Sequence, residues 1–172
     1  VGNDLWVSGT LGDSGLGLRM LGKKHAQGTS KKLIERHLLP TPRLRLGQAL
    51  ANYHLATAMI DVSDGLLIDT SHLLEESHRG ARIWEDRIPL SRLYRKWISS
   101  HAKESHSMAL YGGEDYELLF TIDQKDFDKI KGNPNLTVIG YIHEKAEGST
   151  LITRSEQRIP IEAQGWNALK NG

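Results

Sequence analysis

Short apolar runs alternate with longer stretches in which apolar residues recur every three or four positions. The recurring spacing predicts helices over residues 30–39, 44–55, 66–77 and 123–130, and another opened by Ser91; the glycine-rich stretch after residue 12 favours a shorter helix less clearly. The short apolar or β-branched runs predict strands over residues 5–7, 58–62, 81–88, 116–122, 136–142, 151–152 and 159–161. Because strands and helices are interleaved, we expect an α/β fold: a layered, mixed sheet with packed helices.

Three residues are expected to mark the ends of these helices. Ser30 and Asp123 are N-cap candidates, and Gly80 is placed just past the end of helix 66–77. The small residues of strand 58–62 predict that it is buried, which would put Asp61 at the buried end of a strand.

Composition narrows the possible classes of protein. The 172 residues carry a net charge of +1 with dispersed basic residues, so we expect no nucleic-acid partner. The absence of cysteine excludes disulfides and thiolate chemistry and suits a reducing, cytoplasmic compartment. No apolar stretch approaches 18 residues, so no membrane span is expected. The chain starts at Val1 without a signal-peptide pattern, and we expect it to begin inside a larger protein or to be processed.

The segment Ile60-Asp61-Val62-Ser63-Asp64-Gly65 places two carboxylates three residues apart where a strand gives way to a helix. Two close anions favour a neutralising cation, and carboxylates with phosphate oxygens suit Mg²⁺. A helix start also offers free backbone N–H groups to a phosphate. The alternative is helix capping by Ser63 or Asp64.

A second acid-rich segment is Gly112-Gly113-Glu114-Asp115-Tyr116-Glu117, directly before an apolar strand. Acids at this density disfavour a strand, so a cationic ligand, a metal or hydrogen-bond donors should compensate them. The alternative is a turn with solvated acids. A third segment, Gly12-Asp13-Ser14-Gly15, matches part of a serine-protease signature, which we reject because the chain has no matching histidine motif.

Four strings together resemble the pattern of thiamine-monophosphate kinases, within the superfamily of aminoimidazole-ribonucleotide synthetase and selenophosphate synthetase. They are LWVSGTLGD at 5–13, LLPTPRLRLGQAL at 38–50, IDVSDGLLID at 60–69 and GGEDYELLFT at 112–121. The resemblance extends from Asp4 to Trp166. It implies that residues 1–172 are a single carboxy-terminal domain, and that the amino-terminal domain carrying most ATP and magnesium ligands lies outside this chain.

The resemblance also implies an activity and its residues. The γ-phosphoryl of ATP would pass to thiamine monophosphate, with Mg²⁺ bridging the phosphates. Asp61 and Asp64 would bind metal, Ser63 would bind ATP, and Glu114 and Trp166 would contact the thiamine moiety. Further candidates in the same sequence strings are Gly113, Asp115 and Tyr116. Trp166 has an alternative role, packing the tail onto the sheet.

The complete enzyme is expected to be a homodimer formed by the amino-terminal domains, and the isolated chain is expected to be inactive. Two other functions stay open at this point. One is a non-catalytic binding or regulatory domain. The other is a different ATP-dependent synthetase of the same superfamily, against which the GGEDYE string argues.

Overall fold

The computed structural model describes residues 1–21, 28–99 and 106–161, and these build one mixed sheet. Within them the sheet has seven strands in the order β2-β4-β1-β5-β3-β6-β7. Among the strands of the described residues, only β3 and β6 pair in parallel, and every other neighbouring pair is antiparallel. The strands are β1 (Asp4–Ser8), β2 (Ala56–Asp61), β3 (Arg79–Trp84), β4 (Leu118–Ile122), β5 (Leu136–Glu144), β6 (Thr150–Ile152) and β7 (Arg158–Pro160).

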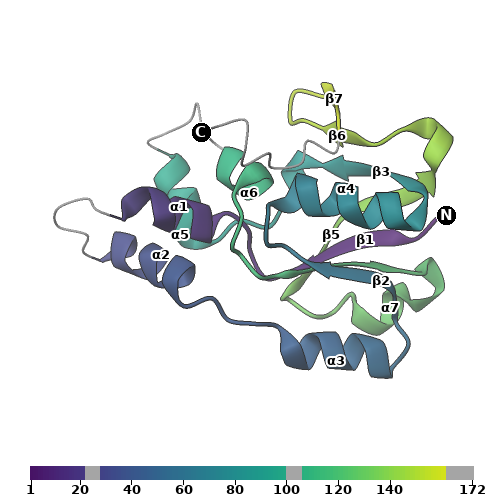
Figure 1. The fold of residues 1–172 in the computed structure, drawn as a ribbon, viewed down its shortest axis with the longest axis horizontal. Coiled ribbons are helices and arrows are strands. Elements are labelled where there is room, and N and C mark those ends of the chain that lie inside the picture. Colours follow the sequence, from purple (N-terminus) through teal and green to yellow (C-terminus); the bar gives the residue numbers. More distant parts are fainter. Residues whose placement is uncertain (22–27, 100–105, 162–172) are drawn as a thin grey trace.

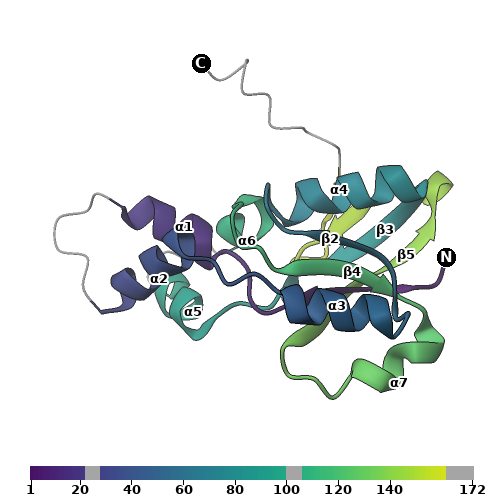
Figure 2. The same ribbon diagram turned by 60° about the horizontal axis from the view of Figure 1, so that its bottom comes forward.

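Helices cover both faces of this sheet, which confirms the layered α/β fold. Helices α4 (Leu66–Ser77) and α6 (Ser107–Tyr111) lie on one face, and α3 (Leu44–Asn52) and α7 (Phe127–Ile130) lie on the other (Figure 2). Helices α1 (Asp13–Met20), α2 (Thr29–Leu38) and α5 (Arg92–Ile98) gather beyond one end of the sheet (Figure 1). Short 3-10 turns span Glu85–Arg87, Gln124–Asp126 and Lys145–Glu147.

Alternation along the central strands divides the core between the two faces. In β1, Leu5 and Val7 join the larger cluster beneath α4, whereas Trp6 joins the smaller cluster beneath α3 and α7. In β4, Leu119 faces the first cluster and Phe120 faces the second. The sheet is therefore held from both sides where β1 and β4 lie.

Several predicted boundaries hold. Helix α4 has the predicted bounds, and Ser91 caps α5 by accepting a hydrogen bond from the Tyr94 N–H at 3.0 Å. Asp123 accepts a hydrogen bond from the Lys125 N–H at 3.1 Å and opens a 3-10 turn that runs into α7. Helix α6 was not predicted from the sequence.

Other boundaries were wrong. Helix α2 begins at Thr29 after Gly28, so Ser30 is not its N-cap. The left-handed residue after α4 is His78, with φ 52°, and Gly80 lies inside β3. A Cβ on Gly80 would lie 2.3 Å from the Gly148 carbonyl oxygen, so close packing of the two backbones requires this glycine. Strand β2 is at a sheet edge and alternates between half-buried and exposed residues, so it is not buried as predicted.

None of the helices within the described residues combines the length and apolarity that crossing a membrane requires.

Candidate functional site

The two acid-rich segments lie directly against each other, joined through their backbones. The Glu114 N–H donates to the Ser63 carbonyl at 2.8 Å, and the Tyr116 N–H donates to the Val62 carbonyl at 2.9 Å. The Val62 N–H in turn donates to the Glu117 carbonyl at 2.8 Å. Residues about 50 positions apart in the sequence thus form one site at the end of β2 and the start of β4.

This close approach depends on a glycine and on unusual backbone angles. A Cβ on Gly113 would lie 2.3 Å from the Ser63 carbonyl oxygen, too close for any larger residue at this position. Glu114 and Tyr116 adopt left-handed conformations with φ of 65° and 52°. Such angles cost non-glycine residues about 1 kcal/mol or more and cluster at functional sites.

Asp61 is the last residue of β2, and Ser63 and Asp64 lie in the turn between β2 and α4. Both carboxylates are exposed, which corrects the prediction that Asp61 ends a strand in the interior. The N-cap position of α4 is Gly65, and no side chain caps the helix. The capping interpretation of Ser63 and Asp64 is therefore wrong.

A residue that the sequence analysis missed, Asp69, holds this turn in place. Its buried Oδ2 accepts hydrogen bonds from the N–H groups of Ser63, Asp64 and Gly65 at 2.9, 3.0 and 3.1 Å. Burial raises the pKa of Asp69, although these three donors oppose the rise. The N–H groups of residues 63–65 are thus not free for a phosphate, contrary to the sequence-based expectation. Asp69 could have been suspected because it closes the string IDVSDGLLID.

Asp64 also lies beside Asp69 and the exposed His72, with one possible metal-ligand atom from each within 4.8 Å of the others. Of the three side chains, that of Asp69 already holds the turn. Asp64, which precedes α4, and His72, in the second turn of α4, remain exposed.

Negative charge concentrates around the hydroxyl of Tyr116. This hydroxyl donates to Glu114 Oε2 at 3.0 Å, and its pKa is raised by that hydrogen bond and by the charges of Glu114, Asp61 and Asp64. Within the described residues, no cationic side chain pairs with any of these three exposed carboxylates. A cluster of unneutralised hard oxygen ligands suits Mg²⁺, so the residues present fit the ion that the resemblance implies.

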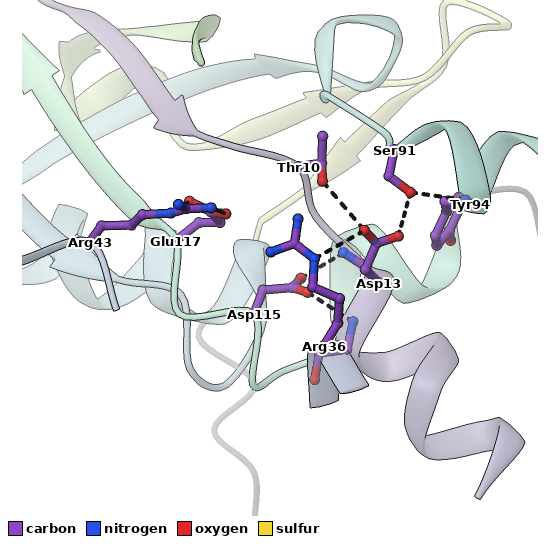
Figure 3. Close-up of polar contacts among 10 residues, drawn as sticks. Thr10, Asp13, Arg36, Arg43, Ser91, Tyr94, Asp115 and Glu117 are labelled. Carbon is purple, nitrogen blue, oxygen red and sulfur yellow. Dashed lines mark hydrogen bonds and ion pairs between the residues drawn. The ribbon is translucent and has the colours of Figure 1, made fainter. Parts of the chain in front are cut away.

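The other two acids of the GGEDYE string point into the interior instead (Figure 3). Asp115 accepts hydrogen bonds from the N–H groups of Gly12 at 2.6 Å and Ser14 at 3.1 Å, at the start of α1. Burial, with smaller contributions from the charges of Asp13 and Glu117, raises the pKa of Asp115 to about 7. The structure therefore places Asp115 at the junction of the turn with α1, where its carboxylate is already hydrogen-bonded.

Glu117 is 2% exposed and forms a bidentate pair with Arg43, in which Arg43 Nε lies 2.7 Å from Glu117 Oε2. The hydroxyl of Ser8 donates to the same carboxylate and accepts the N–H of Leu118 at 2.9 Å. Hydrogen-bond donors and a cation thus compensate Glu117, one of the possibilities that the sequence left open. Arg43, which the sequence analysis did not single out, lies in the string LLPTPRLRLGQAL.

Buried Asp13 extends this polar network to α5 and α2. It accepts a hydrogen bond from Ser91 Oγ at 2.6 Å, and Arg36 Nε lies 3.9 Å from its Oδ2. Burial raises the pKa of Asp13. Next to it, Ser14 Oγ lies 2.9 Å from His37 Nδ1, but Ser14 is 1% exposed. A substrate cannot reach a serine so deeply buried, which agrees with rejection of the protease signature.

The raised pKa of Asp115 predicts a pH-dependent stability. The folded chain holds this proton up to about pH 7, whereas the unfolded chain releases it near pH 3.8. Unfolding therefore releases a proton between these values, and the contribution of Asp115 to the free energy of unfolding should fall as the pH rises from about 4 to about 7. Urea unfolding at several pH values should show this slope in the original chain and lose it in Asp115→Asn.

A matched control for this measurement is Asp128→Asn, at a carboxylate that is 80% exposed. Its pH profile should follow that of the original chain. An Asp115→Asn profile parallel to the original over the same range would show that Asp115 is ionised throughout.

Trp166 lies outside the described residues, so its two possible roles stay predictions.

Comparison with known proteins agrees with the resemblance. A thiamine-monophosphate kinase of Haemophilus influenzae is 42% identical over 153 residues, covering 84% of this chain and 45% of the relative. One of Buchnera aphidicola from Acyrthosiphon pisum is 38% identical over 176 residues, covering 97% and 53%. The chain thus spans about half the length of the curated relatives it matches.

Solved structures agree as well. The thiamine monophosphate kinase of Aquifex aeolicus superposes with a TM-score of 0.77 at 34% identity, covering 92% of this chain and 52% of that one. AaThiL complexed with AMPPCP and TMP gives the same TM-score and identity, covering 92% and 49%. The Escherichia coli hydrogenase maturation protein HypE, at 19% identity and a TM-score of 0.59, shares the fold. The family model for the AIR synthase related protein, C-terminal domain, matches residues 1–152, and the chain belongs to this family.

Proposed function

We propose that this chain is the carboxy-terminal half of a kinase that transfers the γ-phosphoryl group of ATP to thiamine monophosphate, giving thiamine diphosphate. The observation that carries the proposal is the backbone pairing of residues 62–63 with residues 114–117, which gathers Asp61, Asp64 and Glu114 around one tyrosine hydroxyl. The similarity to thiamine-monophosphate kinases, and the solved complex of one relative with AMPPCP and TMP, support this substrate class for the acidic site.

Phosphoryl transfer to a phosphate acceptor asks little covalent chemistry of the protein. The phosphates need positioning, and their charge needs neutralisation. An exposed pair of carboxylates in a turn fixed by a buried aspartate suits that task. No side-chain nucleophile is required, and the buried Ser14 is not one.

Asp61 and Asp64 would hold Mg²⁺, and Ser63 would contact ATP. When bound, the ion neutralises phosphate charge and orients the phosphates. The chain's own contribution is to keep both carboxylates exposed where β2 runs into a turn, whose backbone is held by Asp69 and packs against Gly113.

The substrate end is assigned to Glu114, with Trp166 as its aromatic partner. Glu114 is exposed, and its carboxylate can accept a hydrogen bond from the aminopyrimidine of thiamine. An aromatic face suits the cationic thiazolium, with a contact worth about 0.5–2 kcal/mol. Gly113 and Tyr116 shape this turn, whereas Asp115 anchors it from the inside.

The remaining ligands would come from an amino-terminal domain that precedes residues 1–172 in the complete enzyme. That domain would carry most of the ATP and magnesium ligands and form a homodimer. The length of the relatives, about twice that of this chain, supports this arrangement.

Two exposed aspartates offer too few ligands for a site with several Mg²⁺ ions, so the purified chain should form no thiamine diphosphate from ATP and thiamine monophosphate. A chimera in which it replaces the matching half of the Aquifex aeolicus relative should form the product. Chromatography of thiamine phosphates measures both reactions.

The two reactions test separately whether the chain needs the amino-terminal half and whether it takes part in catalysis. Turnover by the chain alone, free of contaminating kinase, would show that the other half is dispensable. A cooperatively folded chimera that binds ATP but makes no product would favour a non-catalytic binding domain.

A further inference from the structure

A second candidate site lies toward the β7 end of the strand order, away from β2, where β3 and β6 end and β7 begins. An open groove of about 640 Å³ occurs there, a volume typical of sites for small ligands. Its charged and aromatic lining comprises Arg82, Trp84, Asp86, Arg154, Glu156 and Arg158. Strands β3 and β6, which pair in parallel, deliver Trp84 and Ile152 side by side to this edge (Figure 1).

The three arginines of the groove have no acidic partner in the part of the chain that the structure describes. Among the described residues, no carboxylate lies within ion-pair distance of Arg82, Arg154 or Arg158. The Nε–H of Arg82 is buried and has no hydrogen-bond acceptor within residues 1–21, 28–99 and 106–161, an arrangement that is uncommon and costly in a folded protein. The groove therefore presents three guanidinium groups that no acidic side chain of the described residues neutralises.

An aromatic wall accompanies these cations. Trp84 and Tyr141 pack with ring centroids 5.5 Å apart, and the guanidinium of Arg82 lies 5.6 Å from the Tyr141 ring. Arg87 stacks over Trp84 at 4.3 Å. The loop beyond β6 is tied to this wall, because the backbone N–H of Arg154 donates to Glu85 Oε2 at 3.0 Å. The groove is built on strands and an anchored loop.

The groove is distinct from the acidic site. Strands β2 and β3 are separated in the sheet by β4, β1 and β5, and four strand spacings amount to about 19 Å. The two sites also differ in charge: exposed carboxylates surround Tyr116, whereas three arginines outnumber two exposed acids in the groove.

We propose that this groove binds a small organic phosphate that carries a flat ring, such as a nucleoside phosphate. Guanidinium groups bind phosphate oxygens in bidentate fashion, and a phosphate would neutralise the charge of Arg82, Arg154 and Arg158, for which the described residues supply no carboxylate. The ring would lie against the Trp84 side of the groove. The two exposed acids, Asp86 and Glu156, can accept hydrogen bonds from hydroxyl groups of the ligand. The proposal stands whether or not the chain is part of a kinase.

Calorimetric titration of the chain with ADP in the absence of Mg²⁺ tests this site, with inorganic pyrophosphate and adenosine as partial ligands. ADP should bind saturably below about 1 mM, more tightly than either partial ligand. The double variant Arg154→Gln with Arg158→Gln should bind ADP at least tenfold more weakly. Both side chains are exposed, so the fold should survive.

The matched control changes the same net charge elsewhere: Arg45→Gln with Arg95→Gln, both exposed and outside the groove. This control should keep the ADP affinity of the original chain. An equal loss of ADP affinity in the control would mean that overall charge causes the effect. A loss of ADP affinity in Asp64→Asn would mean that ADP binds at the acidic site. Either result, or no binding of ADP, overturns the proposal.

Discussion

Replacing Asp61 or Asp64 by asparagine in the complete enzyme should lower kcat about 100-fold or more, the scale for removing one preorganised electrostatic group from a transition state. The expectation rests on the proposed kinase activity. Both carboxylates are exposed, one at the end of β2 and one in the turn after it, and no cation among the described residues neutralises them. A bound cation would therefore act next to the phosphates, where charge develops during transfer. The measurement is kcat at saturating ATP and Mg²⁺.

Folding should survive both changes, so lost activity can be assigned to the site. Neither side chain caps α4, and the turn is held by Asp69. The control is Asp128→Asn, at a position far along the sequence from Asp61 and Asp64. Its exposed carboxylate pairs with Lys131, and this variant should keep the original kcat. If both variants retained near-normal rates, Asp61 and Asp64 would have no part in holding the metal.

The sequence predicts most of the fold because the pattern of apolar residues reflects which face of each element is buried. Helix α4 is the clearest case: its apolar residues include Leu66, Leu67, Leu73 and Leu74, all of which are buried, and its predicted bounds match. Strand β2 shows where this reasoning fails. Its residues resemble those of a buried strand, but the order of strands places it at an edge, and strand order depends on contacts between distant segments.

The capping residue after helix α4 was predicted wrongly for a similar reason. His78 adopts the left-handed conformation that the sequence assigned to a glycine, and Gly80 is needed two residues later for contact with Gly148. Local preference indicates which residue adopts an angle easily. It does not indicate where the backbones of distant segments meet.

The candidate site could be located from its two acidic strings, but the roles of individual acids could not. Five acids look alike in the sequence, and the structure divides them by partner. Asp61, Asp64 and Glu114 remain exposed, while Asp115 and Glu117 are compensated from inside. The partners that decide this lie far away along the chain, in the segments near residues 12 and 43.

The substitution with the largest expected effect on stability is Arg43→Ala, which breaks the pair of Arg43 with Glu117. Arg43 directly precedes α3 and Glu117 directly precedes β4, so their bidentate pair joins a helix on one face of the sheet to the turn that carries the acidic site. Arg43→Ala would leave the carboxylate of Glu117, which is 2% exposed, with the Ser8 hydroxyl as its remaining side-chain donor. Breaking one side of a buried pair costs about 3–5 kcal/mol, and because the Arg43 side chain is 29% exposed, urea unfolding should show a loss at the lower end of this range.

Two further variants make the test specific. Removing both charges in Arg43→Met with Glu117→Met should cost less than Arg43→Ala alone, because no unpaired charge then remains buried. Lys131→Ala breaks an ion pair whose side chains are 56% and 80% exposed, and should change the free energy of unfolding by less than about 1 kcal/mol. A similarly small change in Arg43→Ala would mean that Glu117 finds another partner or a proton. The turn at residues 112–117 would then be held mainly by its backbone hydrogen bonds to Val62 and Ser63.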